Sequence, residues 1–385
     1  MMITNDIKYI GVNDHKVDLF EGQFVVPDGM AYNSYVIMDQ KIAVFDTVDR
    51  DFGDTWMRNL KIALDGKKPD YLIVQHMEPD HSANIARFVT EYPDAEVVAT
   101  AKAISMLPQF FGEGFAPRTI AVKEGESLGL GKHNLRFVTA PMVHWPEVML
   151  TYDEESKTLF SADAFGKFGA LDKDDDWACE ARRYYFGIVG KFGPQVQETL
   201  KKAAALDIAR ICPLHGPVLD SNLGYYIGLY DTWSAYRPEE KGVVINYTSV
   251  YGNTKKAVML LADKLRALGC EKVVTNDLAR CDIHEAIEDT FRYDKAIFAT
   301  TTYNGKIFPQ MHAFIHHLTE RNFQNRKIGF VENGTWAATA AKNMKAMFEN
   351  SKNLEFCETT VTIKSAMNSA NEKEIEALAK EIFER

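Results

Sequence analysis

The sequence predicts two α/β domains in one chain, a sandwich of short strands followed by a doubly wound parallel sheet. Its 385 residues exceed one ordinary hydrophobic core and suit two domains of roughly 100–200 residues each. Strands and helices alternate irregularly up to about residue 230, and regularly after segment 236–242, where a proline stands in a run of charged residues. We therefore expect one domain over residues 1–238 and another over 239–385.

In the first domain, short apolar runs bounded by turn residues predict strands. A helix is expected over 56–64, where apolar residues recur at helical spacing before Gly66. The strands are expected at 34–38, 42–46, 71–74, 95–100, 135–140, 158–162 and 208–214. The first two strands are separated by only three residues, which indicates a hairpin.

After residue 239, strands and helices follow one another in turn, the pattern of a parallel sheet covered on both faces. Strands are expected at 243–247, 296–300 and 327–331, and helices at 255–268, 309–318, 337–348 and 372–383. About 145 residues suit a five-stranded doubly wound sheet. In such a sheet the ligand binds at the carboxyl ends of the strands.

The composition limits the partners that the chain can have. A net charge of −10 argues against nucleic acid and anionic membrane surfaces. No secretory leader is visible, and no apolar run approaches the roughly 20 residues of a membrane span. The five cysteines are scattered without a Cys-x-x-Cys pair, so neither a disulfide framework nor a cysteine-based metal module is expected. A cytoplasmic location fits these features.

The loop after the strand 71–74 has the side chains of a metal site. Within six residues it contains His76, Glu78, Asp80 and His81, and Pro79 excludes the interior of a helix. A loop that leaves a rigid sheet can direct its side chains at one point. Histidine and aspartate are also common in ordinary turns, but four candidate ligands in six residues favour a metal.

Three further strands end at a candidate ligand, namely His144, Asp163 and His215. If the four loops converge on one edge of a sandwich, they bring together four imidazoles and three carboxylates, more than one metal needs. Two metals with Asp163 between them are the natural count. A cysteine-free, carboxylate-rich set suits non-haem iron or manganese, although zinc binds many such sites more tightly.

The second domain has a candidate phosphate loop between its first strand and helix. Hydroxyl- and glycine-rich loops at a helix N-terminus bind anions through unpaired amides and the helix dipole. This loop resembles that of flavodoxins, and two later strand ends supply candidate contacts to the flavin ring of FMN. The predicted contacts are Ser249, Val250, Tyr251, Gly252, Asn253 and Thr254; Thr301, Thr302, Tyr303, Asn304 and Gly305; and Asn333, Gly334, Thr335, Trp336 and Ala337.

The metal motifs together resemble those of the flavodiiron proteins, also called A-type flavoproteins. The loop is similar to the His-x-His-x-Asp-His signature of metallo-β-lactamase-like hydrolases, with Glu78 in place of the second histidine. The resemblance covers nearly the whole chain. It implies a metallo-β-lactamase-like αββα sandwich and a flavodoxin-like sheet of order 2-1-3-4-5.

The resemblance also implies a ligand set and an activity. One iron would be held by His76, Glu78 and His144, and the other by Asp80, His81 and His215, with Asp163 bridging. FMN would pass electrons to this centre, where dioxygen is reduced to water, or nitric oxide to nitrous oxide, or both; the sequence does not rank the two gases. The electron donor is expected to be external: rubredoxin, a flavin reductase or a deazaflavin carrier.

A head-to-tail homodimer, or a dimer of such dimers, is the assembly that the resemblance implies. In it the flavin of one chain would serve the irons of the other. Two other classes stay open: a metal hydrolase with a flavodoxin domain for docking, and an electron-transfer flavoprotein with a structural metal. Glu78 argues against the hydrolase, because hydrolytic two-zinc sites use an imidazole there.

Five other histidines are not expected to bind metal. His312 and His316 have i, i+4 spacing but no glutamate between them, so an exposed helix face is expected. His15, His133 and His284 stand in polar segments and are expected at the surface.

Overall fold

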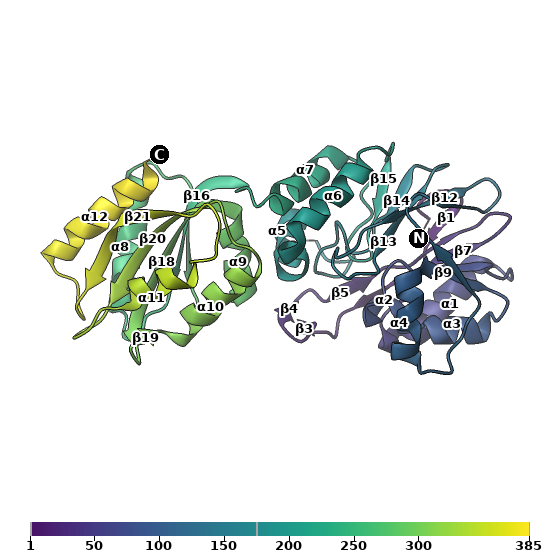
Figure 1. The fold of residues 1–385 in the computed structure, drawn as a ribbon, viewed down its shortest axis with the longest axis horizontal. Coiled ribbons are helices and arrows are strands. Elements are labelled where there is room, and N and C mark those ends of the chain that lie inside the picture. Colours follow the sequence, from purple (N-terminus) through teal and green to yellow (C-terminus); the bar gives the residue numbers. More distant parts are fainter. Residues whose placement is uncertain (1, 175, 385) are drawn as a thin grey trace. The chain divides into compact units, whose positions relative to one another are not determined.

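The computed structural model describes residues 2–174 and 176–384. The chain divides into two compact units (Figure 1). The first comprises the described residues of Met1–Tyr185 and Pro194–Asp231, and the second those of Phe186–Gly193 and Thr232–Arg385. Within the described residues, no helix is long and apolar enough to cross a membrane.

The first unit contains two main sheets. One has the order β1 (Ile7–Tyr9), β6 (Tyr35–Ile37), β7 (Ala43–Phe45), β8 (Tyr71–Ile73), β9 (Glu96–Thr100) and β10 (Thr119–Val122). The other has the order β11 (Ser127–Gly129), β12 (Asn134–Thr139), β13 (Met149–Asp153), β14 (Thr158–Phe160) and β15 (Arg210–Cys212). In both sheets antiparallel pairs give way to parallel ones, at β7–β8 and at β14–β15.

The two sheets pack face to face over one apolar core. Phe45 of β7 stacks on Phe160 of β14 with ring centroids 4.0 Å apart. Ile37 and Ile73 from one sheet and Phe137 from the other are fully buried in the same cluster. Each strand contributes alternate residues to this interface, which is why runs of only three residues suffice to build the sandwich.

Helices and short elements surround the sandwich. In α1 (Gly53–Leu64), Trp56, Leu60 and Leu64 recur at helical spacing and are buried. α4 (Ala101–Phe111) packs on β9 and β10. The remaining elements of the first unit are η1 (Arg50–Phe52), α2 (Pro79–Ser82), α3 (Ile85–Glu91), α5 (Trp177–Tyr184), α6 (Gly193–Ala203), most of α7 (Leu223–Ser234), and two small sheets, β2 (Val12–Asp14) with β5 (Met30–Tyr32) and β3 (Leu19–Phe20) with β4 (Phe24–Val25). Except for Tyr185, η2 (Tyr185–Val189) and η3 (Gly190–Phe192) belong to the second unit.

The second unit is a parallel sheet in the order β17 (Val273–Asp277), β16 (Glu240–Tyr247), β18 (Tyr293–Tyr303), β20 (Lys327–Asn333) and β21 (Glu355–Ile363). Counted along the chain this is 2-1-3-4-5, so the expected doubly wound topology is confirmed. The short β19 (Lys306–Ile307) pairs antiparallel with the end of β18.

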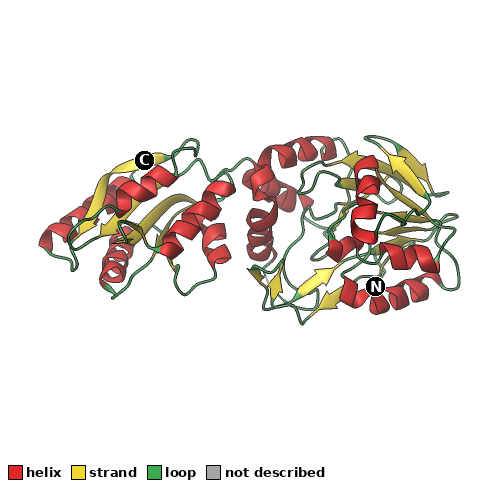
Figure 2. Ribbon diagram, turned by 60° about the horizontal axis from the view of Figure 1, so that its bottom comes forward, coloured by secondary structure: helices red, strands yellow, loops and turns green. Residues whose placement is uncertain are grey.

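Helices cover both faces of this sheet (Figure 2). α8 (Asn253–Ala267) and α12 (Ser369–Phe383) contact each other and share one core cluster with β16. α9 (Ile283–Arg292), α10 (Pro309–Glu320) and α11 (Ala340–Met347) contact one another in sequence order on the other face. The strand β16 turns into α8 through residues 248–252, where the phosphate loop is expected.

Two of the set-aside histidines are buried, so the expectation of surface positions was wrong for them. His133 is 2% exposed, and its Nδ1 lies 2.8 Å from Oδ2 of the fully buried Asp153. His284 is buried in the first turn of α9. His15, His312 and His316 are exposed, as expected. Polar sequence neighbours therefore did not place His133 at the surface, because Asp6 and Asp153, which are distant from it in the sequence, pair with its ring.

Candidate two-metal centre

Four loops at strand ends bring the seven predicted ligands together. They follow β8, β12, β14 and β15. In the first loop Pro79 occupies the first position of α2, where its missing N–H is not needed. Asp80 and His81 therefore stand on a single helical turn, and Glu78 precedes it in an extended conformation.

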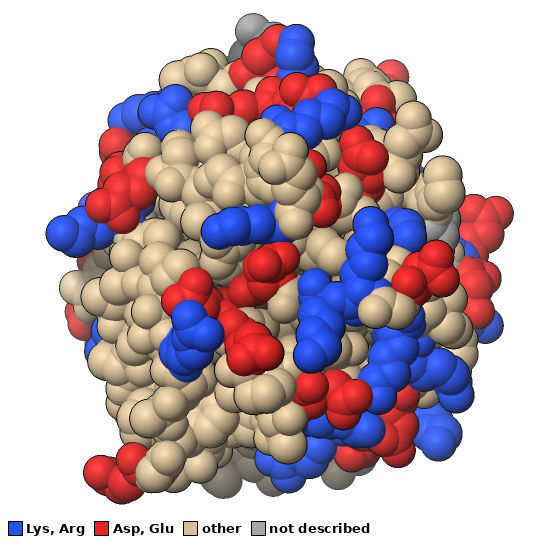
Figure 3. Space-filling view, turned by 90° about the vertical axis from the view of Figure 1, so that its right-hand side faces the viewer, with Lys and Arg blue, Asp and Glu red and all other residues tan. Residues whose placement is uncertain are grey.

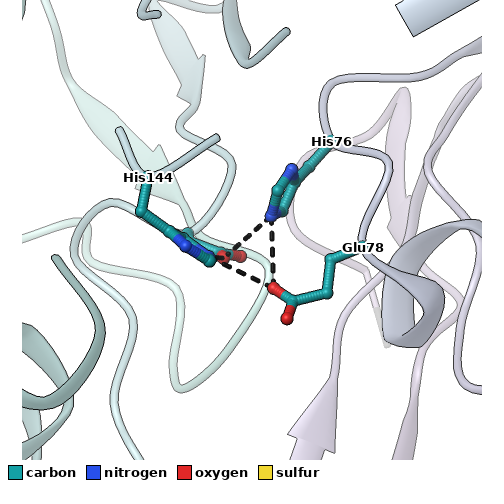
Figure 4. Close-up of side chains that lie close together, drawn as sticks. His76, Glu78 and His144 are labelled. Carbon is teal, nitrogen blue, oxygen red and sulfur yellow. Dashed lines mark hydrogen bonds and ion pairs between the residues drawn. The ribbon is translucent and has the colours of Figure 1, made fainter. Parts of the chain in front are cut away.

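Three side chains and Asp163 form a first group. Nε2 of His144 lies 3.2 Å from Oε2 of Glu78 and 3.2 Å from Oδ2 of Asp163. Nε2 of His76 lies 3.3 Å from the same Glu78 oxygen and 3.5 Å from Oδ2 of Asp163. Figure 4 shows His76, Glu78 and His144 pointing toward one another. Atoms bound about 2.1 Å from one ion lie about 3.0–3.4 Å apart, so this spacing fits a metal.

Asp80, His81 and His215 form the second group. Nε2 of His81 lies 3.0 Å from Nε2 of His215 and 3.2 Å from Oδ2 of Asp80. Nε2 of His215 lies 3.3 Å from the same oxygen of Asp80. The atoms of each group all lie within 4.8 Å of one another.

Asp163 faces both groups with different oxygens. Its Oδ2 faces His76 and His144, whereas its Oδ1 lies 3.2 Å from Nε2 of His81 and 3.9 Å from that of His215. A carboxylate in this position can bridge two ions, one on each oxygen. The geometry thus suits two adjacent metals with one shared ligand.

Two hydrogen bonds behind the imidazoles determine which ring nitrogen faces the centre. Nδ1 of His76 lies 2.9 Å from Oε1 of Glu147, and Nδ1 of His215 lies 2.7 Å from the carbonyl oxygen of Ala31. Since a carbonyl only accepts, the proton of His215 is on Nδ1 and its Nε2 lone pair is available to a metal. Sequence reasoning missed both partners. Glu147 was detectable, because it is an acidic residue in the same buried loop as His144.

The centre is built to hold positive charge. Burial alone would lower the pKa of His144, but hydrogen bonds to Asp163 and Glu78 raise it to about 9. Burial would likewise raise the pKa of Asp163, yet the attraction of His76 and its neighbours holds it well below its usual range. Both oxygens of Asp80 and Oδ1 of Asp163 are buried without a hydrogen-bond donor in the described part of the chain. A bound cation would supply the partner that these carboxylate oxygens lack.

The backbone around Asp163 is held in a specific conformation. Ala162 and Phe165 have positive φ angles of 49° and 67°, which cost non-glycine residues about 1–3 kcal/mol each. The hydroxyl of Ser161 donates to the carbonyl of Ala164 at 2.7 Å, and the amide of Phe165 donates to the hydroxyl of Tyr230 at 2.6 Å. These bonds hold the turn that aims Asp163 between the two groups.

In the second unit, the three predicted FMN loops line one cavity of about 570 Å³. Its lining consists of Ser249, Val250, Tyr251, Asn253 and Thr254, residues 301–305 and 333–337, together with Thr339 and Ser365. Gly252 is outside the lining and caps α8 with φ +91°. Thr339 and Ser365 were missed; Ser365 follows β21, whose carboxyl end meets the same edge of the sheet.

The cavity has the features that FMN requires. The hydroxyl of Ser249 accepts hydrogen bonds from the amides of Gly252 and Lys255, at 3.1 and 3.2 Å, which closes the loop before α8. The first amides of a helix are unpaired and attract a phosphate. Tyr303 and Trp336 are 45% and 92% exposed beside the cavity, so their rings are available to a flavin.

The sandwich with its two-metal centre and the doubly wound flavin-type unit define a class, the metal-containing flavoprotein oxidoreductases. Known proteins agree with this class. The ODP family beta lactamase matches residues 30–216, and a flavodoxin domain matches residues 244–364. The anaerobic nitric oxide reductase flavorubredoxin of Salmonella arizonae is 29% identical over 91% of this chain and 75% of its own length.

Solved structures share the fold. The rubredoxin oxygen:oxidoreductase of Desulfovibrio gigas has a TM-score of 0.92 at 24% identity, over 100% of this chain and 97% of that one. The flavodiiron protein of Giardia intestinalis has a TM-score of 0.87 at 24% identity, over 99% and 95%. The chain belongs to the flavodiiron protein family, and its cofactors are accordingly FMN and a pair of irons.

Proposed function

We propose that the chain reduces dioxygen to water, nitric oxide to nitrous oxide, or both, at a diiron centre supplied with electrons by FMN. The observation that carries the proposal is Asp163, which presents one oxygen to each of two adjacent ligand groups. Dioxygen needs four electrons and four protons to become two waters. Two molecules of nitric oxide need two of each to become nitrous oxide and water. Reduced FMN and two ferrous irons supply four electrons.

In this proposal the ligands act in two sets. His76, Glu78 and His144 would hold one iron, Asp80, His81 and His215 would hold the other, and Asp163 would be shared between them. Iron held there would supply the redox chemistry of gas reduction. Glu147 and the carbonyl of Ala31 keep the two imidazoles in the required tautomer. The indole of Trp145, 5.2 Å from the ring of His76, excludes water from one side of the pocket.

For FMN we propose the contacts expected from the sequence. The amides that begin α8, with Ser249 and Thr254, hold the phosphate. Tyr303 and Trp336 flank the flavin ring, and the loop 333–337 reaches its polar edge. The cavity of about 570 Å³ supports this assignment.

The proposal includes the partners and the domain organisation. An external donor reduces FMN; rubredoxin, a flavin reductase and a deazaflavin carrier are the candidates. We also propose a domain boundary at residues 238/239, a head-to-tail homodimer and a cytoplasmic location. The net charge of −10 argues against nucleic acid as a partner. In agreement with this, acidic and basic side chains lie interspersed on the face shown in Figure 3.

The test is anaerobic turnover of the purified protein with each gas in turn, with a reduced donor present. A yellow flavin spectrum, about two irons per chain and consumption of at least one gas are expected. A colourless, zinc-loaded protein that cleaves esters or lactams would overturn the proposal in favour of a hydrolase. His144→Ala should abolish gas consumption while FMN stays bound; retained turnover would contradict the ligand assignment.

A further inference from the structure

Helix α10 turns a row of polar side chains toward solvent. Its buried face consists of Met311, Phe314, Ile315 and Leu318. On the other face His312, His316 and Glu320 are exposed and follow one another at intervals of four residues. Residues four apart in a helix lie on the same face, with Cβ atoms roughly 5–6 Å apart. Two imidazoles and a carboxylate therefore stand in one exposed row along the helix.

Glu320 lies close to the second histidine of this row. Its Oε1 is 3.2 Å from Nε2 of His316, although both side chains are more than half exposed. Atoms that bind one ion at about 2.1 Å lie at this spacing. No glutamate stands between the two histidines in the sequence, but the helix brings one to His316 from the following turn. The row thus contains the types of group that bind transition metals.

The side chain of His312 is available to a ligand, whereas that of the neighbouring His317 is engaged. The imidazole of His312 is exposed and makes no hydrogen bond or ion pair with any described residue. Nδ1 of the half-buried His317 lies 3.4 Å from Nη1 of Arg321. A guanidinium at that nitrogen repels a cation. Metal binding on α10 is therefore expected at His312 and His316, and not at His317.

We propose that His312 and His316 chelate a divalent transition-metal ion on the surface of the second unit, with Glu320 as the neighbouring anion. Two histidines one helical turn apart can bind the same ion. Imidazole nitrogens suit Zn²⁺, Cu²⁺ and Ni²⁺, whereas Mg²⁺ and Ca²⁺ prefer oxygen ligands. Water completes the coordination, because the face is open to solvent. The site shares no ligand with the two-metal centre, whose ligands all belong to the first unit.

An ion bound in this way stabilises α10. The unfolded chain does not hold the two imidazoles one helical turn apart, so the ion favours the folded state. α10 contacts α9 and α11. Phe308, which precedes the helix, packs its ring edge-on to Tyr303 of the loop 301–305, with centroids 5.3 Å apart. Metal binding is therefore expected to raise the Tm of the second unit.

The test is calorimetric titration of the iron- and FMN-loaded protein with Ni²⁺ at pH 7.5, because imidazole binds metal in its neutral form. We expect the wild type to bind one Ni²⁺ per chain that His312→Gln and His316→Gln bind about 10-fold more weakly or not at all. Comparison between proteins cancels any exchange at the two-metal centre. Glu320→Gln should weaken binding less. His15→Gln is the matched control and should bind as wild type, since His15 is a single exposed imidazole 3.2 Å from a carboxylate oxygen of Asp172.

Equal Ni²⁺ stoichiometry and affinity in the wild type and both histidine variants would overturn the site and leave an exposed helix face with an ion pair. The same holds if Ni²⁺ raises the Tm of the wild type no more than that of the variants. A second measurement needs no variant: Ni²⁺ should protect His312 and His316 of the wild type from modification by diethyl pyrocarbonate, as read by mass spectrometry, and leave His15 reactive. Unprotected modification of His312 and His316 would overturn the proposal, whatever gas the protein reduces.

Discussion

Glu147 illustrates how a residue that touches no proposed substrate can control a metal ligand. Its Oε1 accepts from Nδ1 of His76 and from the amide of Met77, both at 2.9 Å. The carboxylate is buried, and the hydrogen bond with His76 lowers its pKa although burial opposes this. It therefore accepts both hydrogen bonds as an anion, which fixes the ring and makes Nε2 more basic.

We predict that Glu147→Gln weakens iron binding by roughly 10–100-fold, because an amide oxygen is a weaker acceptor than a carboxylate. Titration of the metal-free protein with ferrous iron measures this, and flavin content should not change. Glu154→Gln, an exposed glutamate after β13, is the control. An unchanged iron affinity would show that His76 does not depend on Glu147.

His133 provides a test of stability at the residue scale. Its hydrogen bond to Asp153 raises the pKa of the imidazole, although burial opposes this, and Asp6 adds to the effect. A raised folded-state pKa means that the contribution is fully present below the unfolded value of about 6.5. It is lost as the pH rises through the higher folded value.

We predict that His133→Gln lowers the free energy of unfolding of the first unit by about 1–3 kcal/mol at pH 6 and by less at pH 9. Denaturant titration at the two pH values measures the difference. The exposed His15→Gln is the control, and its effect should be small at both. An equal loss for His133→Gln at both pH values would mean that packing, rather than charge, is what the variant removes.

At the scale of elements, sequence patterns identified strands with continuous apolar runs and missed those without them. β8 and β16 were expected nearly where they occur, because each contains a run of buried apolar residues. β13 was missed, since it contains Thr151 and Asp153, which are buried only because neighbouring strands and His133 cover them. The two-residue strands β3 and β4 are too short to give any periodic signal in the sequence.

The same contrast holds for the candidate site. The inward side chains could be predicted, because ligand chemistry limits them to a few residue types near strand ends. The carbonyl of Ala31 could not be predicted, because it meets the ring of His215 only when the fold brings together segments that are distant in the sequence. The phosphate loop could be placed for the opposite reason: a strand, a turn and a helix are consecutive in the chain.

A substitution at Gly252 can test the predicted phosphate loop. It has φ +91°, and no atom lies within 4 Å of a Cβ added there, so an alanine meets only the strain of a left-handed backbone. We predict that Gly252→Ala weakens FMN binding about 5- to 10-fold, since roughly 1 kcal/mol of strain shifts the loop. Fluorescence titration of the flavin-free protein measures this. Gly114→Ala, which is equally open but lacks a positive φ, should bind FMN normally.

At the scale of the molecule, the two cofactors belong to different units, so electrons must pass from one unit to another. Either the units of one chain cooperate, or those of two chains do. The proposed head-to-tail homodimer makes the second case the functional one. The two cases differ in what happens when two inactive variants share a dimer.

We predict that mixing two inactive variants restores activity. One is His144→Ala, with FMN and a disabled metal centre. The other is Gly334→Val, whose added Cβ would lie 2.8 Å from the carbonyl oxygen of Ala337 and displace the loop beside the FMN cavity. Co-refolded at equal amounts, about half of the dimers are mixed by random pairing, and each mixed dimer has one intact flavin–iron pair across the interface.

Each variant alone must be inactive, and the spectrum of the second must show no flavin. If electrons instead pass within one chain, no chain in the mixture has both cofactors, and turnover stays at background. Recovery to about a quarter of wild-type activity requires transfer between chains, because half of the dimers then have one of their two centres working. This experiment assigns the pathway by stoichiometry and needs no knowledge of how the units are oriented.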